Sequence, residues 1–122
     1  MRWCLLLLVA TAAFAQSGEK EPWVAPPEAT AKANPLAGKP ALAEGGKKMF
    51  TRTCAVCHDA GENQKGPSLS STAVQAQTDG ALFWKITNGN SRTGMPNFNS
   101  LPDGLRWQLV LYIRSMAKTT KP

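Results

Sequence analysis

Hydrophobic residues recur at helical intervals near the C-terminal end of the chain, so they would lie on one face of a helix. Ser100-Leu101-Pro102-Asp103 precedes this run with the spacing of a capping box, although an Asp stands where Glu or Gln is usual. The pattern therefore predicts a C-terminal helix whose apolar face meets the core. The positions on that face are Leu105, Leu109, Tyr112, Ile113 and Met116.

Two further helices are predicted upstream. Residues 43–53 can form a helix, and Thr78 offers an N-cap for a short helix through Ile86 that Asn88-Gly89 would end. No stretch alternates between apolar and polar positions long enough to indicate a strand. We therefore expect an all-α fold of three to five helices. Its long connections would run over residues 59–78 and 88–100, and loops of that length in a small domain are usually functional.

The segment at residues 16–42 differs from the rest of the chain, because it holds five prolines and six alanines. This proline density predicts an extended arm or linker in which no helix forms. Trp23 is its single large aromatic residue. Two interpretations stay open for this side chain: a stray exposed residue, or a peg that holds the arm against the domain.

The N-terminus has the features of a cleavable signal peptide. Arg2 supplies a positive start, residues 4–13 are almost wholly apolar, and Ala13-Phe14-Ala15 has the small-x-small form of a cleavage site. The apolar run is too short to span a bilayer, which takes roughly 20 residues. We therefore predict export to the periplasm, with no membrane anchor after cleavage. The predicted organisation is a signal peptide at 1–15, an arm at 16–42, a domain at 43–119 and a tail at 120–122.

Composition narrows the class of protein. A chain of 122 residues is too short for a multidomain enzyme, and 43% hydrophobic with 18% charged residues is wrong for full disorder. The formal net charge is +6, and removal of residues 1–15 leaves 13 basic and 8 acidic residues. This basic balance suits an acidic partner, a nucleic acid or a membrane surface. Nucleic acid is disfavoured by the predicted compartment, by the spread of the charges and by the lack of a binding motif.

The chemistry is concentrated in Cys54-Ala55-Val56-Cys57-His58, which has the C-x-x-C-H spacing of c-type haem attachment. Two thiols one helical turn apart reach two vinyl groups of the porphyrin and form thioethers, and the adjoining imidazole is aimed at the iron. The motif uses the single histidine of the chain and both cysteines that remain after the predicted cleavage. The sequence thus predicts one covalently bound haem c, with Cys54 and Cys57 attached to it and His58 bound to its iron.

Three other interpretations compete with haem attachment. A structural zinc site normally takes four nitrogen or sulfur ligands, and the cleaved chain offers three. A thioredoxin-like redox pair is expected in a strand–helix–strand context, which the pattern does not predict. A disulfide between Cys54 and Cys57 would close a very small loop and stabilise little. All three are less consistent with the five-residue motif than haem attachment is.

The second axial position of the iron decides between a carrier and an enzyme, because an open position would bind other ligands. With no second histidine in the chain, the candidate ligands are Met49, Met95 and Met116. Met49 precedes the motif on the same helix and would have to cross to the other haem face, whereas Met116 continues the apolar face of the last helix. Met95 lies in a long loop, where we expect Gly94 to allow close backbone approach and Pro96 to stiffen the residue before it. We therefore predict Met95 as the second ligand.

Taken together, these motifs resemble those of class I c-type cytochromes, the single-haem electron carriers of exported compartments. The resemblance covers residues 43 to about 118. In that family the first helix carries a glycine and an aromatic residue four positions later, as Gly46 and Phe50 do, and the last helix carries a pair like Leu109 and Tyr112. The resemblance implies that these helices cross at nearly right angles and that Gly46 is the contact that admits Tyr112.

Gly66-Pro67-Ser68-Leu69 also resembles a loop of that family, in which the proline carbonyl accepts the ring N–H of the proximal histidine. By this resemblance Pro67 would fix the tautomer and orientation of His58. No family motif assigns the residues that bind the haem propionates. The candidates for that role are Trp84, Arg92, Asn97 and Trp107.

The resemblance implies outer-sphere transfer of one electron, since iron bound by both His58 and Met95 has no open position. The preferred hypothesis is an electron-transfer protein and not an enzyme, acting as a soluble shuttle or as a small subunit of a respiratory or dehydrogenase complex. A haem enzyme or gas sensor with an open distal site, and a non-haem interaction module with a disulfide, stay open as alternatives. The candidates for an apolar shell around the haem are Phe50, Leu69, Leu82, Phe83, Ile86, Phe98, Leu105 and Leu109.

The predicted partners are a redox donor and a redox acceptor with an acidic docking surface. Basic residues around the exposed haem edge would steer such a surface into a short-lived complex. For any single residue, a role in solubility alone is an equal alternative. The candidates are Lys47, Lys48, Lys65, Lys85 and Arg92.

Overall fold

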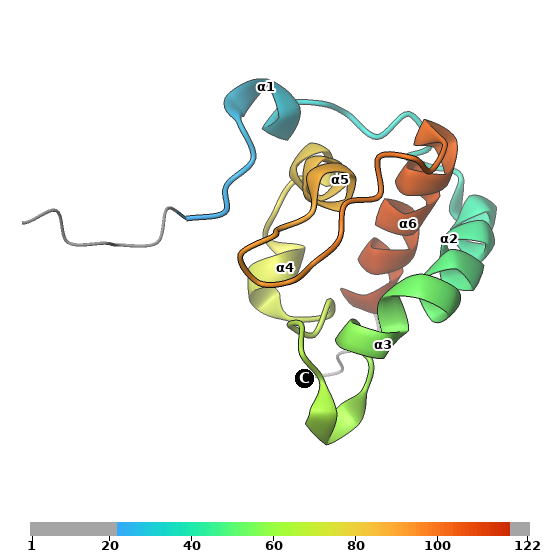
Figure 1. Cartoon of the computed structure of the whole chain (residues 1–122). Helices are drawn as coiled ribbons and strands as arrows, with labels where there is room; N and C mark the ends of the chain where they lie inside the picture. The colour runs from blue at the N-terminus through green and yellow to red at the C-terminus, as the bar shows by residue number, and fades with distance from the viewer. Residues whose placement is uncertain (1–21, 118–122) are drawn as a thin grey trace, which may run out of the picture.

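The computed structural model describes residues 22–117, so the predicted signal peptide at 1–15 and the tail at 120–122 lie outside it. The described chain is helical, and its β-type pairing is one isolated bridge between Asn90 and Met95. The prediction of an all-α fold is therefore confirmed (Figure 1). None of the helices within residues 22–117 combines the length and the apolar character needed to cross a bilayer. In chain order the elements are α1 (Pro27–Thr30), the 3-10 turn η1 (Pro40–Leu42), α2 (Ala43–Met49), the π-helical turn η2 (Phe50–Cys54), α3 (Ala55–His58), the 3-10 turn η3 (Gly61–Asn63), α4 (Thr72–Gln75), α5 (Asp79–Asn88) and α6 (Asp103–Met116).

Helices α2 and α6 lie against each other with their backbones in close contact (Figure 1). A Cβ atom added at Gly46 would lie 2.0 Å from the carbonyl oxygen of Gln108 and 2.9 Å from the nitrogen of Leu109. The expectation that Gly46 admits Tyr112 is therefore corrected, because the atoms nearest to Gly46 belong to the α6 backbone. The Tyr112 ring lies against Phe50 instead, with ring centroids 5.3 Å apart and ring planes tilted by 59°.

The start of α6 differs from the prediction. The helix begins at Asp103 with Pro102 as its N-cap residue, and no side chain caps it. The predicted capping box is therefore wrong, and Ser100 is exposed. The physical reason is that the Asp103 carboxylate is engaged by Arg106 one turn later, so it does not reach back toward Ser100.

The hydrophobic core lies between α2, α5 and α6. α6 contacts α2 on one side and α5 on another, so its buried face is wider than the predicted stripe. Trp107, outside that stripe, is buried and stacks on Phe83 of α5 with ring centroids 3.9 Å apart. Leu105, a predicted shell residue, is half-buried and does not belong to the core cluster. The buried members of the cluster are Phe50, Val74, Leu82, Phe83, Ile86, Trp107, Leu109, Val110 and Ile113.

The predicted short helix is confirmed as α5, together with its cap. The Thr78 hydroxyl accepts a hydrogen bond from the backbone N–H of Ala81 at 3.1 Å, and Gly89 follows the last turn. The long connection before it contains the single-turn helix α4, which the sequence did not predict. Arg114 of α6 holds this region, because it donates to the carboxylate of Asp79 at 2.6 Å and to the backbone oxygen of Gln75 at 2.7 Å.

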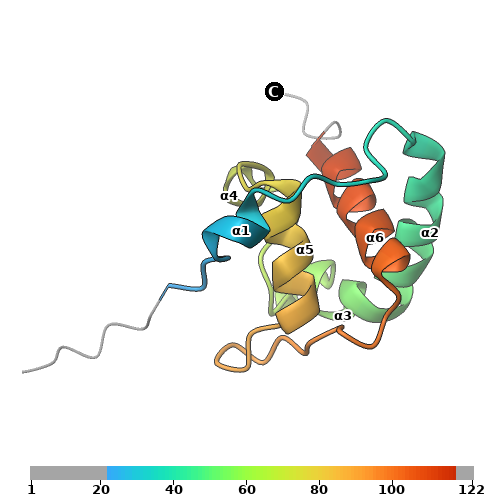
Figure 2. The same ribbon diagram turned by 90° about the horizontal axis from the view of Figure 1, so that it is seen from above.

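The proline-rich arm contains the short helix α1, so the prediction that no helix forms there is wrong. Pro27 stands at the first helical position, where a missing N–H costs nothing and the fixed φ of proline suits a helix. The arm then runs across α5 and α6 (Figure 2). Thr78 donates its hydroxyl hydrogen to the Thr30 carbonyl at 2.7 Å, and the Lys85 amino group lies 4.8 Å from the centroid of the Trp23 ring. These contacts favour the interpretation of Trp23 as a peg.

The close contact between α2 and α6 predicts a cost for any side chain at Gly46. Gly46→Ala should lower the free energy of unfolding of the haem-loaded protein by about 2–3 kcal/mol, because the new Cβ would overlap the Gln108 carbonyl. Guanidinium unfolding followed by circular dichroism measures it. Gly104→Ala in α6 is the control, since its Cβ would meet nothing within 4 Å; it should stabilise by at most about 1 kcal/mol. Equal effects of the two variants would contradict the close contact.

The packing of the arm predicts a second effect. A Cβ at Gly80 would lie 2.1 Å from the Ala29 carbonyl oxygen and 2.6 Å from that of Lys32. Gly80→Ala should therefore displace the arm and speed tryptic cleavage after Lys32 by at least about tenfold, since proteolysis follows local opening. Mass spectrometry of timed digests measures the rate. An unchanged rate, equal to that of Gly104→Ala, would show that the arm is held by other contacts.

Candidate functional site

The cysteine pair follows a π-helical turn that re-aims the chain. In η2 the backbone N–H of Ala55 bonds to the carbonyl of Phe50, five residues earlier, so one extra residue is inserted between α2 and α3. Such insertions are frequent at functional sites. Cys54 and Cys57 are half-buried free thiols at the start and the end of one helical turn, while the side chain of Val56 between them is 74% exposed. The turn therefore directs both sulfur atoms to the same side of the helix.

The environment of Cys54 separates the competing interpretations of the motif. Burial, with a smaller contribution from neighbouring Cys57, raises the pKa of the Cys54 thiol from 9.0 to about 11. Nucleophilic and redox-active cysteines need a lowered thiol pKa, because the thiolate is the reactive species. Cys54 thus lacks the lowered pKa of an attacking thiol in a redox pair.

His58 is oriented by the loop that follows it. Its Nδ1 atom lies 2.9 Å from the carbonyl oxygen of Pro67, which can only accept, so Nδ1 carries the proton. Gly66 lies against the ring, where a Cβ would be 2.6 Å from Cε1 and 2.7 Å from Nδ1. The same glycine donates its N–H to the Cys57 carbonyl at 2.8 Å. The remaining nitrogen, Nε2, is therefore the atom available to a metal.

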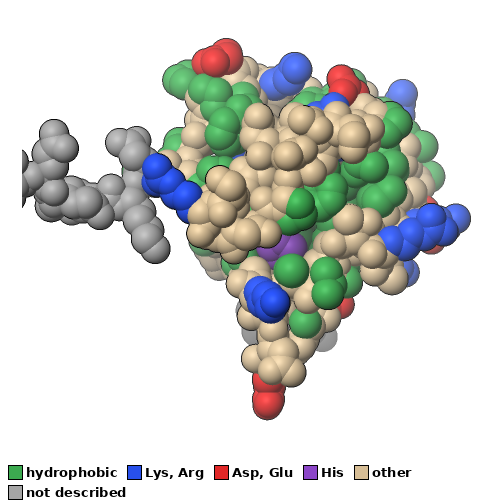
Figure 3. Space-filling model, in the orientation of Figure 1, with side chains coloured by type: hydrophobic (Ala, Val, Ile, Leu, Met, Phe, Trp, Pro, Cys, Tyr) green, Lys and Arg blue, Asp and Glu red, His purple; other side chains and the backbone are tan. Residues whose placement is uncertain are grey.

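Two cavities lie near this region, and the smaller one adjoins the candidate site. It measures about 220 Å³ and is lined by His58, Phe50, Leu69, Tyr112 and Met116, with Asp59, Ser68 and Ser70 at its polar side. Figure 3 shows the histidine side chain at the surface of this face, bordered by hydrophobic side chains.

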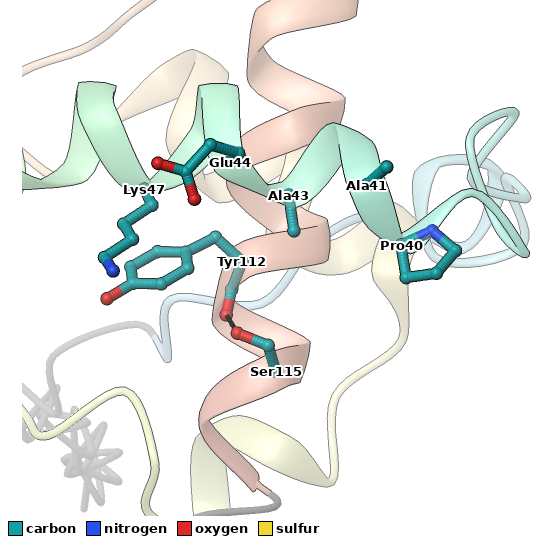
Figure 4. A pocket seen from close by; sticks show the side chains of 7 residues that line it. All are labelled: Pro40, Ala41, Ala43, Glu44, Lys47, Tyr112 and Ser115. Atoms are coloured by element: carbon teal, nitrogen blue, oxygen red, sulfur yellow. Dashed lines mark hydrogen bonds between the residues drawn. The ribbon is translucent and has the colours of Figure 1, made fainter.

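The larger cavity, of about 370 Å³, lies between η1, α2 and the end of α6 (Figure 4). Its lining includes Glu44, Lys47 and Ser115 but neither cysteine nor His58. It is therefore not the site that the motif predicts, although Tyr112 borders both cavities.

Met95 is half-buried and lies in the loop between α5 and α6. A Cβ at Gly94 would meet no other described atom of the chain within 4 Å, so Gly94 makes no close contact with another segment of the chain. Gly94 is needed for its φ of +87°, a conformation that other residues rarely adopt. The close approach occurs at Gly89 instead, where a Cβ would lie 2.5 Å from the carbonyl carbon of Pro96. From its sequence, Gly89 is predicted only as the end of the short helix.

The other two methionines have different surroundings. The sulfur of Met49 accepts a hydrogen bond from the Thr53 hydroxyl at 3.3 Å within the same helical segment. Met116 is half-buried and lines the 220 Å³ cavity together with His58. Met116 is therefore nearer to the candidate site than its place in the apolar face of α6 suggested.

The remaining candidates are spread over the surface and the core. Lys85 is partly buried, its pKa is lowered by burial, and its amino group donates to Gln77 at 2.6 Å. It is therefore engaged with Gln77 and Trp23, and the proposed steering role does not fit it. Trp107 is buried in the core, and Trp84 is half-buried. The exposed candidates are Lys47, Lys48, Lys65, Arg92 and Asn97.

Taken together, the residues fit a covalently attached haem. Two thiols lie one turn apart on the same side, one of them held neutral by burial. A single imidazole is held by Pro67 with Nε2 left for iron, and apolar side chains such as Phe50 and Leu69 adjoin it. Cys54 and Cys57 would hold the porphyrin through thioethers, and His58 would hold the iron.

Comparison with known proteins identifies a family that this chain resembles. A family model described as "Cytochrome C oxidase, cbb3-type, subunit III" matches residues 41–113, which is more than half of the chain. The matched segment includes the C-x-x-C-H motif, Pro67 and Met95. No curated protein and no solved structure matched the chain.

The contact between Gly66 and His58 predicts how the imidazole is held. Gly66→Ala should push the ring away and weaken its hydrogen bond to Pro67, because the new Cβ would lie inside van der Waals distance of the ring. In the reduced protein, exchange of the His58 ring N–H with solvent should accelerate by at least about tenfold, as NMR can measure. Gly61→Ala, on the same loop with nothing within 4 Å, is the control. Slow exchange in both variants would show that Gly66 does not hold the ring.

Proposed function

Because the chain belongs to the "Cytochrome C oxidase, cbb3-type, subunit III" family, and is therefore a c-type cytochrome with covalently bound haem c, we propose that its iron is bound by His58 and Met95 and carries one electron at a time. When it is bound, the haem supplies the one-electron chemistry of its iron. The side chains of this chain attach the haem and orient the ligands of the iron.

The strongest support for this proposal comes from the residues on the proximal side of the iron. It is the 2.9 Å contact between Nδ1 of His58 and the Pro67 carbonyl oxygen. This hydrogen bond fixes one tautomer and leaves Nε2 for the iron. Gly66 lies against the ring and leaves room for that orientation, because a side chain there would push the ring away. Cys54 and Cys57 attach the porphyrin on the same side of the chain.

The distal side is supplied by Met95. Its segment is fixed to the end of α5 by the backbone bridge with Asn90, so the side chain leaves a held backbone. A thioether ligand raises the reduction potential relative to a second imidazole. Two protein ligands leave no open position, which favours transfer of electrons over reaction with oxygen or peroxide.

We propose that the protein works in the periplasm after removal of a signal peptide at 1–15. Cytochrome c domains are usually exported, which agrees with this assignment. The partners would be redox proteins with acidic docking surfaces, steered by the exposed side chains of Lys47, Lys48, Lys65 and Arg92. The family description names an oxidase subunit, which supports a role either as a soluble shuttle or as an electron-transfer subunit of a respiratory complex.

Replacement of Met95 tests the distal ligand. Met95→Ala should abolish the sulfur-to-iron charge-transfer absorption of the oxidised protein and lower the reduction potential by at least about 60 mV, a tenfold change for one electron. The reduced variant should also bind carbon monoxide at neutral pH. Absorption spectra and a redox titration measure these changes.

Met116→Ala is the matched control, because Met116 also adjoins the site of His58 but is expected to pack rather than to bind iron. It should keep the absorption band. Loss of the band in Met116→Ala, with its retention in Met95→Ala, would contradict the proposal, because it would show that Met116 and not Met95 binds the iron. A wild-type protein that lacks the band and binds carbon monoxide would instead support a haem enzyme or gas sensor with an open distal site.

A further inference from the structure

The segment that carries Met95 is tied to the C-terminal end of α5 on both sides of the methionine. Asn90 and Met95 exchange two backbone hydrogen bonds, N–H of Asn90 to O of Met95 at 2.9 Å and N–H of Met95 to O of Asn90 at 3.0 Å. Three residues further on, Phe98 donates its N–H to the Ile86 carbonyl at 3.1 Å. Because Ile86 is part of the buried core, the bond from Phe98 connects the segment that follows the methionine to that core.

Gly89 is the point of closest contact between the two segments. Its backbone has φ +63° and ψ −170°, a combination that essentially only glycine adopts. A Cβ at this position would lie 2.5 Å from the carbonyl carbon and oxygen of Pro96 and 2.6 Å from the nitrogen of Asn97. Glycine is therefore required here twice, for its conformation and for the space that its missing side chain leaves. The contact that requires this space is with Pro96, the residue that follows Met95.

Asn90 closes the intervening turn with its side chain and its carbonyl. Its Oδ1 accepts the backbone N–H of Arg92 at 3.2 Å, and its carbonyl accepts the Thr93 N–H at 3.2 Å. Gly94 completes the turn with a φ of +87° in open surroundings. The turn that Asn90 closes therefore places Met95 opposite Asn90 in the bridge.

We propose that Gly89 and Asn90 are positioning residues for the distal ligand. These two residues, which follow the C-terminal end of α5, hold the backbone of Met95 where its sulfur can reach the iron. This inference rests on the proposed function, since it takes Met95 to be the ligand. Thioether sulfur is a neutral ligand on a flexible side chain, so its binding depends on how well its backbone is held beforehand. Weaker contacts at Gly89 and Asn90 would increase the fraction of molecules in which Met95 has left the iron. An external ligand binds to that fraction, so its binding becomes faster.

The test measures cyanide binding to the oxidised, haem-loaded protein, because cyanide can enter only when the methionine has left. Gly89→Ala should raise the rate of cyanide binding by at least about tenfold and weaken the sulfur-to-iron absorption. Asn90→Ala should raise the rate by at least about threefold, whereas Asn90→Asp, which keeps an oxygen acceptor for the Arg92 N–H, should restore it to near the wild-type value. The two Asn90 variants keep the test decisive if Gly89→Ala does not accumulate.

Two controls separate positioning from general loss of stability. Gly80→Ala is expected to disturb the packing of the arm at the N-terminal end of α5, at the other end of the helix from Gly89, and it should leave the cyanide rate unchanged. Gly61→Ala places a side chain at a nearly equal φ of +61° in open surroundings, and it should also leave the rate unchanged. Gly89→Ala and Asn90→Ala with rates equal to these controls would overturn the inference while leaving Met95 as the ligand. A wild-type protein without the sulfur-to-iron band would overturn the proposed function itself.

Discussion

The contact of α2 with α6 at Gly46 is the constraint on which the site depends. Because the two backbones touch there, α2 can approach α6 in one way only, and Phe50 is brought against Tyr112 one turn later. The π-helical turn then starts from a fixed point, so the directions of Cys54, Cys57 and His58 are set by a contact outside the motif. Attachment of a rigid porphyrin would need this, since both thiols must reach its vinyl groups while the imidazole points at its iron.

Two separate parts of the fold hold the residues that we propose for the two sides of the iron. The proximal side depends on local geometry: the motif, the Pro67 carbonyl and the Gly66 contact all lie within one short stretch of chain. The segment proposed for the distal side is held from α5, through backbone bonds that end in the hydrophobic core. The arm also packs against α5, through α1 and the hydrogen bond from Thr78 to the Thr30 carbonyl. The two proposed ligands, His58 and Met95, thus depend on different elements of the fold.

The sequence predicted what depends on local chemistry and spacing. The C-x-x-C-H motif, the Thr78 cap of α5 and the all-α class follow from side chains that act on neighbours in the chain. Contacts between distant segments were less accessible. Gly46 was recognised as a contact position, but its partner is the Gln108 backbone, which carries no side-chain signal. The predicted capping box is wrong because Arg106 engages Asp103, and the proline density of the arm does not exclude a helix because Pro27 stands at a first helical position. The role that we propose for Gly89 has no signal in the sequence beyond the end of a helix at Asn88-Gly89.

The π-helical turn sets the direction in which the motif faces. In an α-helix each residue turns the chain by about 100° around the axis. The π-helical turn takes up one more residue than an α-helical turn does, so an uninterrupted α-helix through the same residues would rotate the motif by roughly that angle. Val56 would then leave the exposed side that it now occupies, and the two thiols would lie on another side of the helix. The five letters of the motif therefore do not by themselves determine where its thiols lie, because the turn before them does so as well.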